Sequence, residues 1–236
     1  MDFDEFDILA QPDDATCGPT CLHAVYRAYG DAIPLEQVIS EVVPLETGGT
    51  LAVLLACHAL RRGYRTKIFT YNLTIFDPTW WASDVDLSAK LQEQALHKKG
   101  PKLQRATRAY LEYLALGGRM LFQDLNRKLL RSHLQKGRLL LVGLSATYLY
   151  RCARERGTHK LEYDDVRGEA MGHFVVLYGY ERVTNRVWVA DPYHTNPAFQ
   201  SARYAVHIDR VIAAILLGVL TYDANLLLIE PKLEAR

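Results

Sequence analysis

The sequence lacks the features that mark membrane, secreted and nucleic-acid-binding proteins. Its 28 lysines and arginines balance 27 aspartates and glutamates, and a formal net charge of +1 gives no overall field to gather nucleic acid or an anionic membrane. The longest apolar stretch near the C-terminus, Val211 to Leu220, is half of the roughly 20 residues that span a bilayer. We therefore expect no nucleic-acid partner and no membrane insertion.

A secretory signal is also missing, and cysteine is scarce. The segment Met1 to Asp7 is acidic and has neither the basic nor the apolar region of a signal peptide, which predicts a cytoplasmic location. Four scattered cysteines are too few for a disulfide framework, and no pair of C-x-x-C motifs predicts a zinc site. We expect no cofactor, and free thiols at Cys17, Cys21, Cys57 and Cys152.

What is present is an ordinary globular composition, with 236 residues of which 49% are hydrophobic and 23% are charged. Thr16 is a suitable N-cap and Gly30 a suitable stop for a helix that begins at Cys17, on which apolar residues recur at spacings of three and four. Three further elements are predicted before residue 72: helices at Leu35 to Val43 and Leu51 to Arg62, and a strand at Thr66 to Tyr71.

The rest of the chain divides into a helical middle and a strand-rich end. The middle third shows helical patterns at Leu87 to Lys99, Leu103 to Leu116 and Leu121 to Gln135. The last third predicts strands at Leu139 to Leu144, Phe174 to Tyr180, Arg186 to Ala190 and Leu226 to Ile229, and a helix at Val211 to Leu217. The second and third of these strands should form an antiparallel hairpin. We predict one α+β domain over residues 1–236, with N-terminal helices packed on an antiparallel sheet and a helical insertion at about 72–137.

Cys17 is the candidate nucleophile, because the partial positive charge at a helix N-terminus favours its thiolate. His173 begins one strand of the predicted hairpin and Asp191 ends the other, so both should lie at the same end of the sheet. Asp191 could then orient the imidazole, as the third member of a Cys-His-acid arrangement. Gln11 could supply a side-chain amide beside the Cys17 backbone N–H, which makes a two-donor oxyanion hole.

These residues resemble the bacteriocin-processing cysteine peptidases of the papain-like clan. The resemblance rests on Gln11, Asp14 to Leu22, Gly172 to Leu177 and Ala190 to Pro192. It implies a papain-like peptidase fold in which glutamine, cysteine, histidine and aspartate fill the four roles given above. It also implies a peptide or protein substrate. The matching motifs cover under a fifth of the chain.

Two departures from the family pattern limit what the resemblance implies. Family members are usually fused to an ABC transporter and cut leader peptides after a double glycine, whereas this sequence has no membrane or ATPase segment. The transport-coupled role is therefore not implied. The separation of Cys17 from His173 is also longer than the compact family domain needs, and the helical middle third accounts for the excess. We expect a stand-alone, soluble member with its own substrate.

Other cysteines and histidines are given structural roles. Cys21 lies one helical turn after Cys17, where disulfide geometry is poor and core packing is the better interpretation. His194 is an alternative base close after Asp191, but it falls in a loop and has no acid partner at hairpin spacing. Packing or satisfied structural roles are predicted for Cys57, Cys152, His23, His58 and His207.

Three further features could reflect either function or packing. The basic run His97 to Arg108 is interpreted as a solvated helix face and linker rather than a polyanion or partner patch. Trp80 and Trp81 are interpreted as residues that pack the insertion on the core rather than as the lining of a substrate groove. The acidic loop before His173 could hang over the cleft, where it would favour a basic substrate segment and raise the pKa of His173. Its carboxylates are Glu162, Asp164, Asp165 and Glu169.

The sequence therefore predicts a cysteine peptidase or amidase that cleaves a peptide through a Cys17-His173-Asp191 triad with a Gln11 oxyanion hole. An acyl transferase would use the same thiol, with an amine in place of water. A catalytically silent peptide- or leader-binding module is the rival from another class. A partner-binding protein that acts through the helical insertion is the third possibility.

Overall fold

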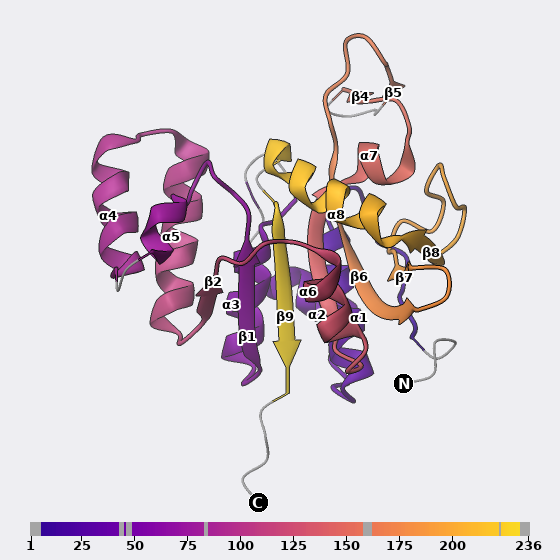
Figure 1. The fold of residues 1–236 in the computed structure, drawn as a ribbon, viewed down its shortest axis with the longest axis horizontal. Helices are drawn as coiled ribbons and strands as arrows, with labels where there is room; N and C mark the ends of the chain where they lie inside the picture. The colour runs from indigo at the N-terminus through magenta and orange to yellow at the C-terminus, as the bar shows by residue number, and fades with distance from the viewer. Residues whose placement is uncertain are drawn as a thin grey trace, which may run out of the picture.

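A computed structural model describes residues 6–42, 45, 49–82, 85–157, 162–221 and 223–231 of the chain. Its centre is a seven-stranded sheet in the order β2-β1-β9-β3-β6-β7-β8, which Figure 1 shows with helices on both sides. Neighbouring strands are antiparallel except β1 and β2, which are parallel. The predicted α+β class, with helices packed on a largely antiparallel sheet, is confirmed.

The elements have the following bounds. The α-helices are α1 (Cys17–Ala28), α2 (Leu35–Glu41), α3 (Ala52–Arg61), α4 (Leu87–His97), α5 (Pro101–Ala115), α6 (Arg127–Leu134), α7 (Ala146–Tyr150) and α8 (Ile208–Leu217). The main strands are β1 (Arg65–Thr70), β2 (Arg119–Leu121), β3 (Leu140–Ser145), β6 (Gly172–Glu181), β7 (Arg186–Ala190), β8 (Arg203–His207) and β9 (Asn225–Glu230). Two 3₁₀ helices, η1 (Pro78–Trp81) and η2 (Gly218–Thr221), and a small sheet of β4 (Glu155–Arg156) and β5 (Glu162–Tyr163) complete the fold.

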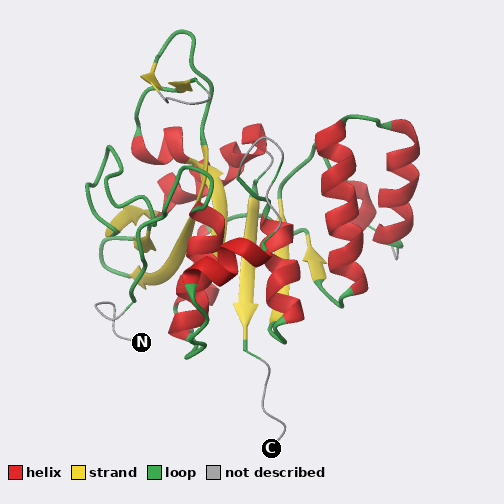
Figure 2. Cartoon of the chain, turned by 180° about the vertical axis from the view of Figure 1, so that it is seen from behind, coloured by secondary structure: helices red, strands yellow, loops and turns green. Residues whose placement is uncertain are grey.

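Helices cover both faces of the sheet. In Figure 1, α6 and α8 lie in front of it, and Figure 2 shows α1, α2 and α3 on the opposite face. Strand β6 contributes side chains to the cores on both faces of the sheet. Phe174 and Val176 belong to the core cluster that contains α1 and α3. Val175 and Leu177 belong to the cluster that contains α8. This alternation explains why the central strands have continuous apolar sequences.

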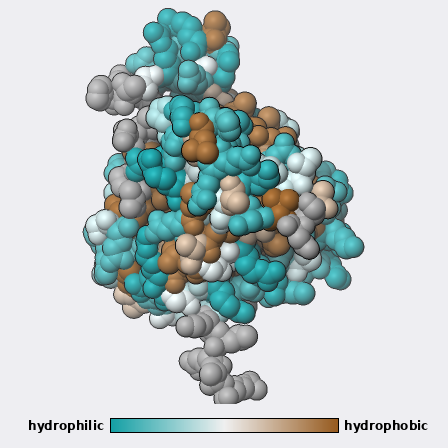
Figure 3. All heavy atoms as spheres, turned by 90° about the vertical axis from the view of Figure 1, so that its left-hand side faces the viewer, coloured by the Kyte–Doolittle hydropathy of each residue, from teal (hydrophilic) through white to brown (hydrophobic). Residues whose placement is uncertain are grey.

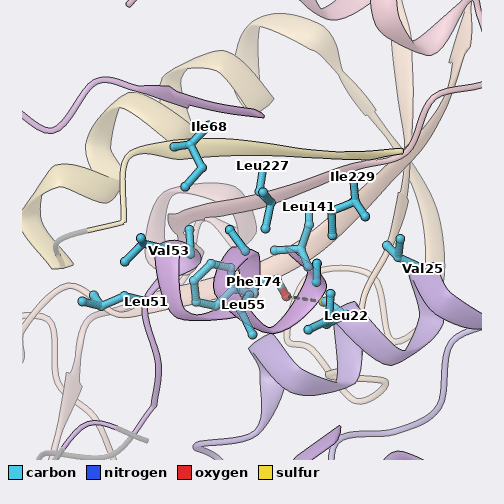
Figure 4. Packing of buried hydrophobic residues seen from close by; sticks show 14 of the residues in the cluster. Leu22, Val25, Leu51, Val53, Leu55, Ile68, Leu141, Phe174, Leu227 and Ile229 are labelled. Carbon is cyan, nitrogen blue, oxygen red and sulfur yellow. Dashed lines mark hydrogen bonds between the residues drawn. The ribbon is translucent and has the colours of Figure 1, made fainter. Parts of the chain in front are cut away.

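The helical layer behind the sheet packs directly onto the strands that lead to the site. Figure 4 shows Leu22 of α1 and Leu55 of α3 beside Phe174 and Leu141 of the sheet, with Val25 farther along α1. Each of these five residues is at most 3% exposed. Burial of large aliphatic and aromatic side chains stabilises by about 1.5–3 kcal/mol each, so this layer fixes α1 against β6.

The segment between β1 and β3 differs from the all-helical prediction. Residues 119–121 form β2, which pairs in parallel with β1 through Ile68 and Met120, and α6 begins only at Arg127. The predicted helix from Leu121 is therefore wrong in its first turns, because a three-residue edge strand is too short to show a period of two. Tyr110 and Tyr113 of α5 lie in the same core cluster as α1 and α3. Helix α5 thus packs against α3 at the edge of the sheet.

A projecting segment follows α7 and returns to the start of β6. It carries β4 and β5, and it rises above the sheet in Figure 1. In Figure 3 the same projection, at the top, has a mostly hydrophilic surface. Within the described part of the chain, no helix has the length and apolar character needed to cross a membrane.

Candidate functional site

Cys17 is the first residue of α1, and Thr16 is its N-cap residue as predicted, but the Thr16 hydroxyl bonds to the Asp13 backbone instead of capping the helix. The neighbouring Gly18 is required by packing, because a Cβ there would lie 2.5 Å from Thr50 Cγ2 and 3.3 Å from Phe174 Cδ2. The N-terminus of α1 therefore approaches β6 closely, which fixes the Cys17 sulfur near the start of that strand. Backbone N–H groups of the first helical turn surround this position and favour negative charge.

His173 and Asp191 meet at the end of the predicted hairpin. Strand β6 pairs with β7 in a register that sets Val176 opposite Ala190, so His173 and Asp191 lie diagonally on the same face. The His173 Nε2–H donates to Asp191 Oδ1 at 2.8 Å. Both side chains are buried, with exposed fractions of 7% for His173 and 0% for Asp191.

Cys17 reaches the same imidazole from the other side. The thiol is hydrogen-bonded to His173, and since Nε2 binds Asp191, Nδ1 is the ring nitrogen that faces the sulfur. Burial alone would lower the pKa of His173, but the charge and hydrogen bond of Asp191, followed by the contact with Cys17, raise its pKa to about 10. The imidazole is therefore protonated at neutral pH, which is the state that stabilises a neighbouring thiolate.

Two tyrosines complete the surroundings of Asp191. The hydroxyls of Tyr150 and Tyr204 donate to Asp191 Oδ2 at 2.8 Å and 2.5 Å, and the Tyr193 N–H donates to Oδ1 at 2.9 Å. Sequence reasoning missed both tyrosines, because α7 and β8 bring them to Asp191 only through tertiary structure. For Tyr204, the apolar residues of β8 could have indicated a further strand of the sheet. The structure pairs this strand with β7 and sets Tyr204 opposite Val189.

Gln11 lies at the rim of the same site. Its backbone N–H donates to Pro192 O at 3.0 Å, which ties the N-terminal loop to the residue after Asp191. One N–H of the side-chain amide donates to Asp13 O at 2.9 Å, and Gln11 Oε1 is buried without a partner among the described residues. An amide nitrogen carries two N–H groups, so a second donor remains for a ligand.

A cleft of about 600 Å³ opens beside Gln11 and His173. Its other lining residues are Asp14, Tyr150, Glu155, Tyr163, Glu169, Ala170, Met171, Gly172 and Tyr193. Three of them are carboxylic acids from separate segments of the chain. Burial and the charge of Asp14 raise the pKa of Glu155, while His173 acts in the opposite direction. The cleft thus has an acidic wall formed by the N-terminal loop and the projecting segment.

The acidic loop predicted from the sequence contributes only in part to this wall. Glu169 lines the cleft, whereas Asp164 is ion-paired with Arg167 and accepts bonds from the neighbouring backbone. Glu162 lies exposed on β5. The largest contributions to the raised pKa of His173 come from Asp191 and Cys17 rather than from this loop.

The remaining cysteines and histidines occupy structural positions. Cys21 is buried and its thiol donates to Phe174 O at 3.2 Å, and the described cysteines are all free thiols. His194 Nε2 faces Ile8 O at 3.2 Å, and His58 binds Tyr26 at 2.8 Å. Among the described residues, no group of three or more His, Cys, Asp or Glu could hold a metal ion.

Comparison with known proteins gives structural matches only. No protein-family model and no curated protein matches the sequence. A protein from Bacillus anthracis assigned as a C39-like peptidase matches with a TM-score of 0.53 and 12% identity, over 97% of this chain and 96% of that chain. The predicted resemblance to this peptidase class is therefore confirmed at the level of the fold.

Two further solved structures match less closely. The peptidase domain of Streptococcus ComA, a bifunctional ABC transporter of a quorum-sensing pathway, has a TM-score of 0.45 and 14% identity, over 97% of this chain and all of that domain. A double-glycine motif protease from an AMS/PCAT transporter, solved with its leader peptide, has a TM-score of 0.43 and 12% identity, over 96% and 91% of the two chains.

Proposed function

We propose that this protein is a cysteine peptidase that cleaves a peptide or protein substrate, with Cys17 as the nucleophile. One observation carries the proposal: Cys17, His173 and Asp191 come from separate segments of the chain and form a continuous hydrogen-bonded series beside an open cleft. The peptidase fold supports the same function. A cytoplasmic location and independence of a cofactor stay predictions from the sequence, and the family's transport role is not part of the proposal.

The thiolate of Cys17 attacks the scissile carbonyl carbon, and the electron pair of the carbonyl moves onto its oxygen. The tetrahedral intermediate collapses to an acyl-enzyme when His173 passes its proton to the leaving amine. Water then gives a proton to His173 and attacks the acyl carbon, which releases the carboxylic acid product and restores the thiolate–imidazolium pair. Asp191 keeps its bond to Nε2 throughout, so Nδ1 is the nitrogen that exchanges the proton.

Two donors are suited to the oxyanion. The Cys17 N–H belongs to the first turn of α1, where backbone donors have no partner within the helix. Gln11 lines the cleft, and its amide has a second N–H that can bind the oxyanion, since only the first is used by Asp13 O. A side-chain amide paired with a backbone N–H is an effective arrangement for a developing negative charge.

Competitive alkylation tests the proposal without a known substrate. Iodoacetamide at pH 6 should label Cys17 faster than the other cysteines, since a thiolate–imidazolium pair stays reactive where an ordinary thiol is protonated. Cys152 is the internal reference, because it is half-buried and its pKa is raised mainly by burial. Peptide mapping by mass spectrometry reads the label at each cysteine.

The variant His173→Gln is the matched control for this experiment. It should bring the Cys17 rate at pH 6 down to that of Cys152, because the imidazolium is lost while the thiol remains. Equal labelling of Cys17 and Cys152 in the wild-type protein would instead identify a catalytically silent binding module. A preference for Cys17 combined with the recovery of a Cys17 acyl-peptide from a digest would establish Cys17 as the nucleophile. Release of a free carboxylic acid product, rather than of an amide formed with an added amine, would then identify a peptidase and not an acyl transferase.

A further inference from the structure

The carboxylate of Asp191 accepts four hydrogen bonds, and its two oxygens have different kinds of donor. Oδ1 accepts from the His173 Nε2–H and from the Tyr193 N–H, at 2.8 Å and 2.9 Å. Oδ2 accepts from the hydroxyls of Tyr150 and Tyr204, at 2.8 Å and 2.5 Å. The oxygen that does not touch His173 is therefore bound by two phenols.

The hydrogen bonds to Asp191 favour its ionised form. Burial of a carboxylate favours its neutral form and raises its pKa, and Asp191 is fully buried. The charge and hydrogen bond of His173 act against burial, and the hydroxyls of Tyr204 and Tyr150 act with His173, so that the pKa of Asp191 falls below its usual range. The two phenols thus supply part of the stabilisation that an ionised, buried Asp191 requires.

Both phenols hold their protons more tightly than an ordinary tyrosine. Burial and the charge of Asp191 raise the pKa of both Tyr150 and Tyr204, so each hydroxyl remains a donor. The other titratable groups that influence this cluster are His173 on β6 and the thiols of Cys17 and Cys21 on α1. Among the described residues that act on Asp191, His173 is the one that carries a positive charge.

The two tyrosines are also held firmly in place. Tyr150 is the last residue of α7, and the Ala146 N–H at the start of this short helix donates to Met171 O, at the entrance to β6. Tyr204 lies on β8 and stacks on Phe199 with ring centroids 3.8 Å apart and an interplanar angle of 9°. Rigid secondary structure therefore sets the position of both hydroxyls, which is what precise orientation of a carboxylate needs.

We propose that Tyr150 and Tyr204 are positioning residues that clamp Asp191 as an ionised, correctly rotated carboxylate, so that the His173 ring keeps Nε2 on Asp191 and Nδ1 toward Cys17. The proposal deepens the proposed function, because it concerns the same site. It assigns a specific task to two hydroxyls that simple packing would not require. Phenylalanine at either position would keep the apolar contacts and lose only the hydrogen bond.

Proton NMR of the His173 Nε2–H tests the clamp directly. A ring N–H bonded to an ionised carboxylate resonates far downfield, and the signal is lost when the carboxylate takes a proton. The acid midpoint of this signal should rise by about one pH unit for each hydroxyl removed, in Tyr150→Phe and in Tyr204→Phe, which is the order expected of a charge-assisted hydrogen bond. Near-UV circular dichroism at the same pH values checks that each variant is folded.

Tyr180→Phe is the matched control. Its hydroxyl donates to Asn185 Oδ1 at 2.7 Å, at the other end of β6, and its ring belongs to the same core cluster as Tyr150 and Tyr204. This variant should leave the acid midpoint unchanged. Acid midpoints that stay at the wild-type value in both Tyr150→Phe and Tyr204→Phe would overturn the clamp. If one of the two variants does not fold, the midpoint of the other decides.

The same measurement in a Cys17→Ser background separates the clamp from the proposed function. The serine protein has no reactive thiol, yet it retains His173, Asp191 and both tyrosines. Shifted midpoints in this background support the clamp even where alkylation shows no preference for Cys17. Unshifted midpoints together with selective labelling of Cys17 would reject the clamp and leave the peptidase proposal standing.

Discussion

The acid–base side and the oxyanion side of the site are built in different ways. His173 and Asp191 lie at the ends of paired strands, are almost fully buried and share a dense set of hydrogen bonds. Gln11 lies in an N-terminal loop, is only half-buried and leaves one amide oxygen without a partner among the described residues. The acid–base side is thus rigid and pre-formed, while the Gln11 amide on the oxyanion side still has an unpartnered oxygen and a second N–H available to a ligand.

The largest effect is expected from Asp191→Ala. This change leaves His173 and two phenols buried without their acceptor, and breaking a buried charged network costs about 3–5 kcal/mol. The free energy of unfolding should fall by that order in urea titrations, and the preference for alkylation of Cys17 at pH 6 should disappear.

Asp209→Ala serves as the control for this change. Asp209 pairs with Arg127 at the surface and is half-exposed, so its removal should leave the urea midpoint nearly unchanged. An Asp191→Ala protein as stable as the wild type would show that the acid–base side is not held by this network.

Gln11→Ala tests the oxyanion side of the site. Loss of one oxyanion donor should lower the turnover of a cleavable peptide by about 10²–10³-fold. The free energy of unfolding should hardly change, because the side chain makes one exposed hydrogen bond to Asp13 O. Alkylation of Cys17 should also keep its rate, since iodoacetamide forms no oxyanion. A loss of stability or of alkylation comparable with that of Asp191→Ala would remove the distinction between the two sides.

The pH dependence of stability sharpens the comparison further. The pKa of His173 is raised from 6.5 to about 10 in the folded protein, mainly because Asp191 outweighs burial. Its stabilising contribution is complete below pH 6.5 and is lost as the pH rises toward 10. Over this window the free energy of unfolding should fall by up to about 1.4 kcal/mol per pH unit.

His173→Gln should flatten this slope, and urea titrations at several pH values measure it. Gln11→Ala should retain the wild-type slope, because Gln11 has no ionisable group. At the acid end the sign is reversed, since the pKa of Asp191 is lowered and its contribution is lost as the pH falls. An identical alkaline slope in the wild type and in His173→Gln would show that the imidazole is not the group that titrates.

Local signals allowed much of the rigid side to be predicted. The start of α1 at Cys17 follows from the helical periodicity of the apolar residues after it, although the Thr16 side chain does not cap the helix. The β6–β7 hairpin follows from two apolar runs with turn formers between them. Tyr150 and Tyr204 could not be predicted, because their contact with Asp191 depends on how α7 and β8 are placed in three dimensions. The start of α1 and the end of the hairpin could be predicted because each depends on signals that are local in the sequence.

The acidic wall shows the same limit on the other side of the cleft. The sequence placed carboxylates before His173, and Glu169 does line the cleft. Asp14 and Glu155 were not predicted to join it, since the N-terminal loop and β4 are separated by well over a hundred residues. The charge density along the sequence therefore indicated that the wall of the cleft is negatively charged, but not which residues form it.

The smallest expected effect concerns the charge of that wall. Iodoacetate carries a negative charge and iodoacetamide does not, so Asp14, Glu155 and Glu169 should slow the reaction of Cys17 with iodoacetate selectively. Glu155→Gln should raise the ratio of the iodoacetate rate to the iodoacetamide rate by roughly two- to threefold at low salt, and added salt should reduce the difference. Glu36→Gln, at an exposed position on α2, is the control and should leave the ratio unchanged. If neither Glu155→Gln nor added salt changed the ratio, the charge of the wall would have no effect on the reaction of the Cys17 thiol. The oxyanion side would then differ from the acid–base side in its hydrogen bonding alone.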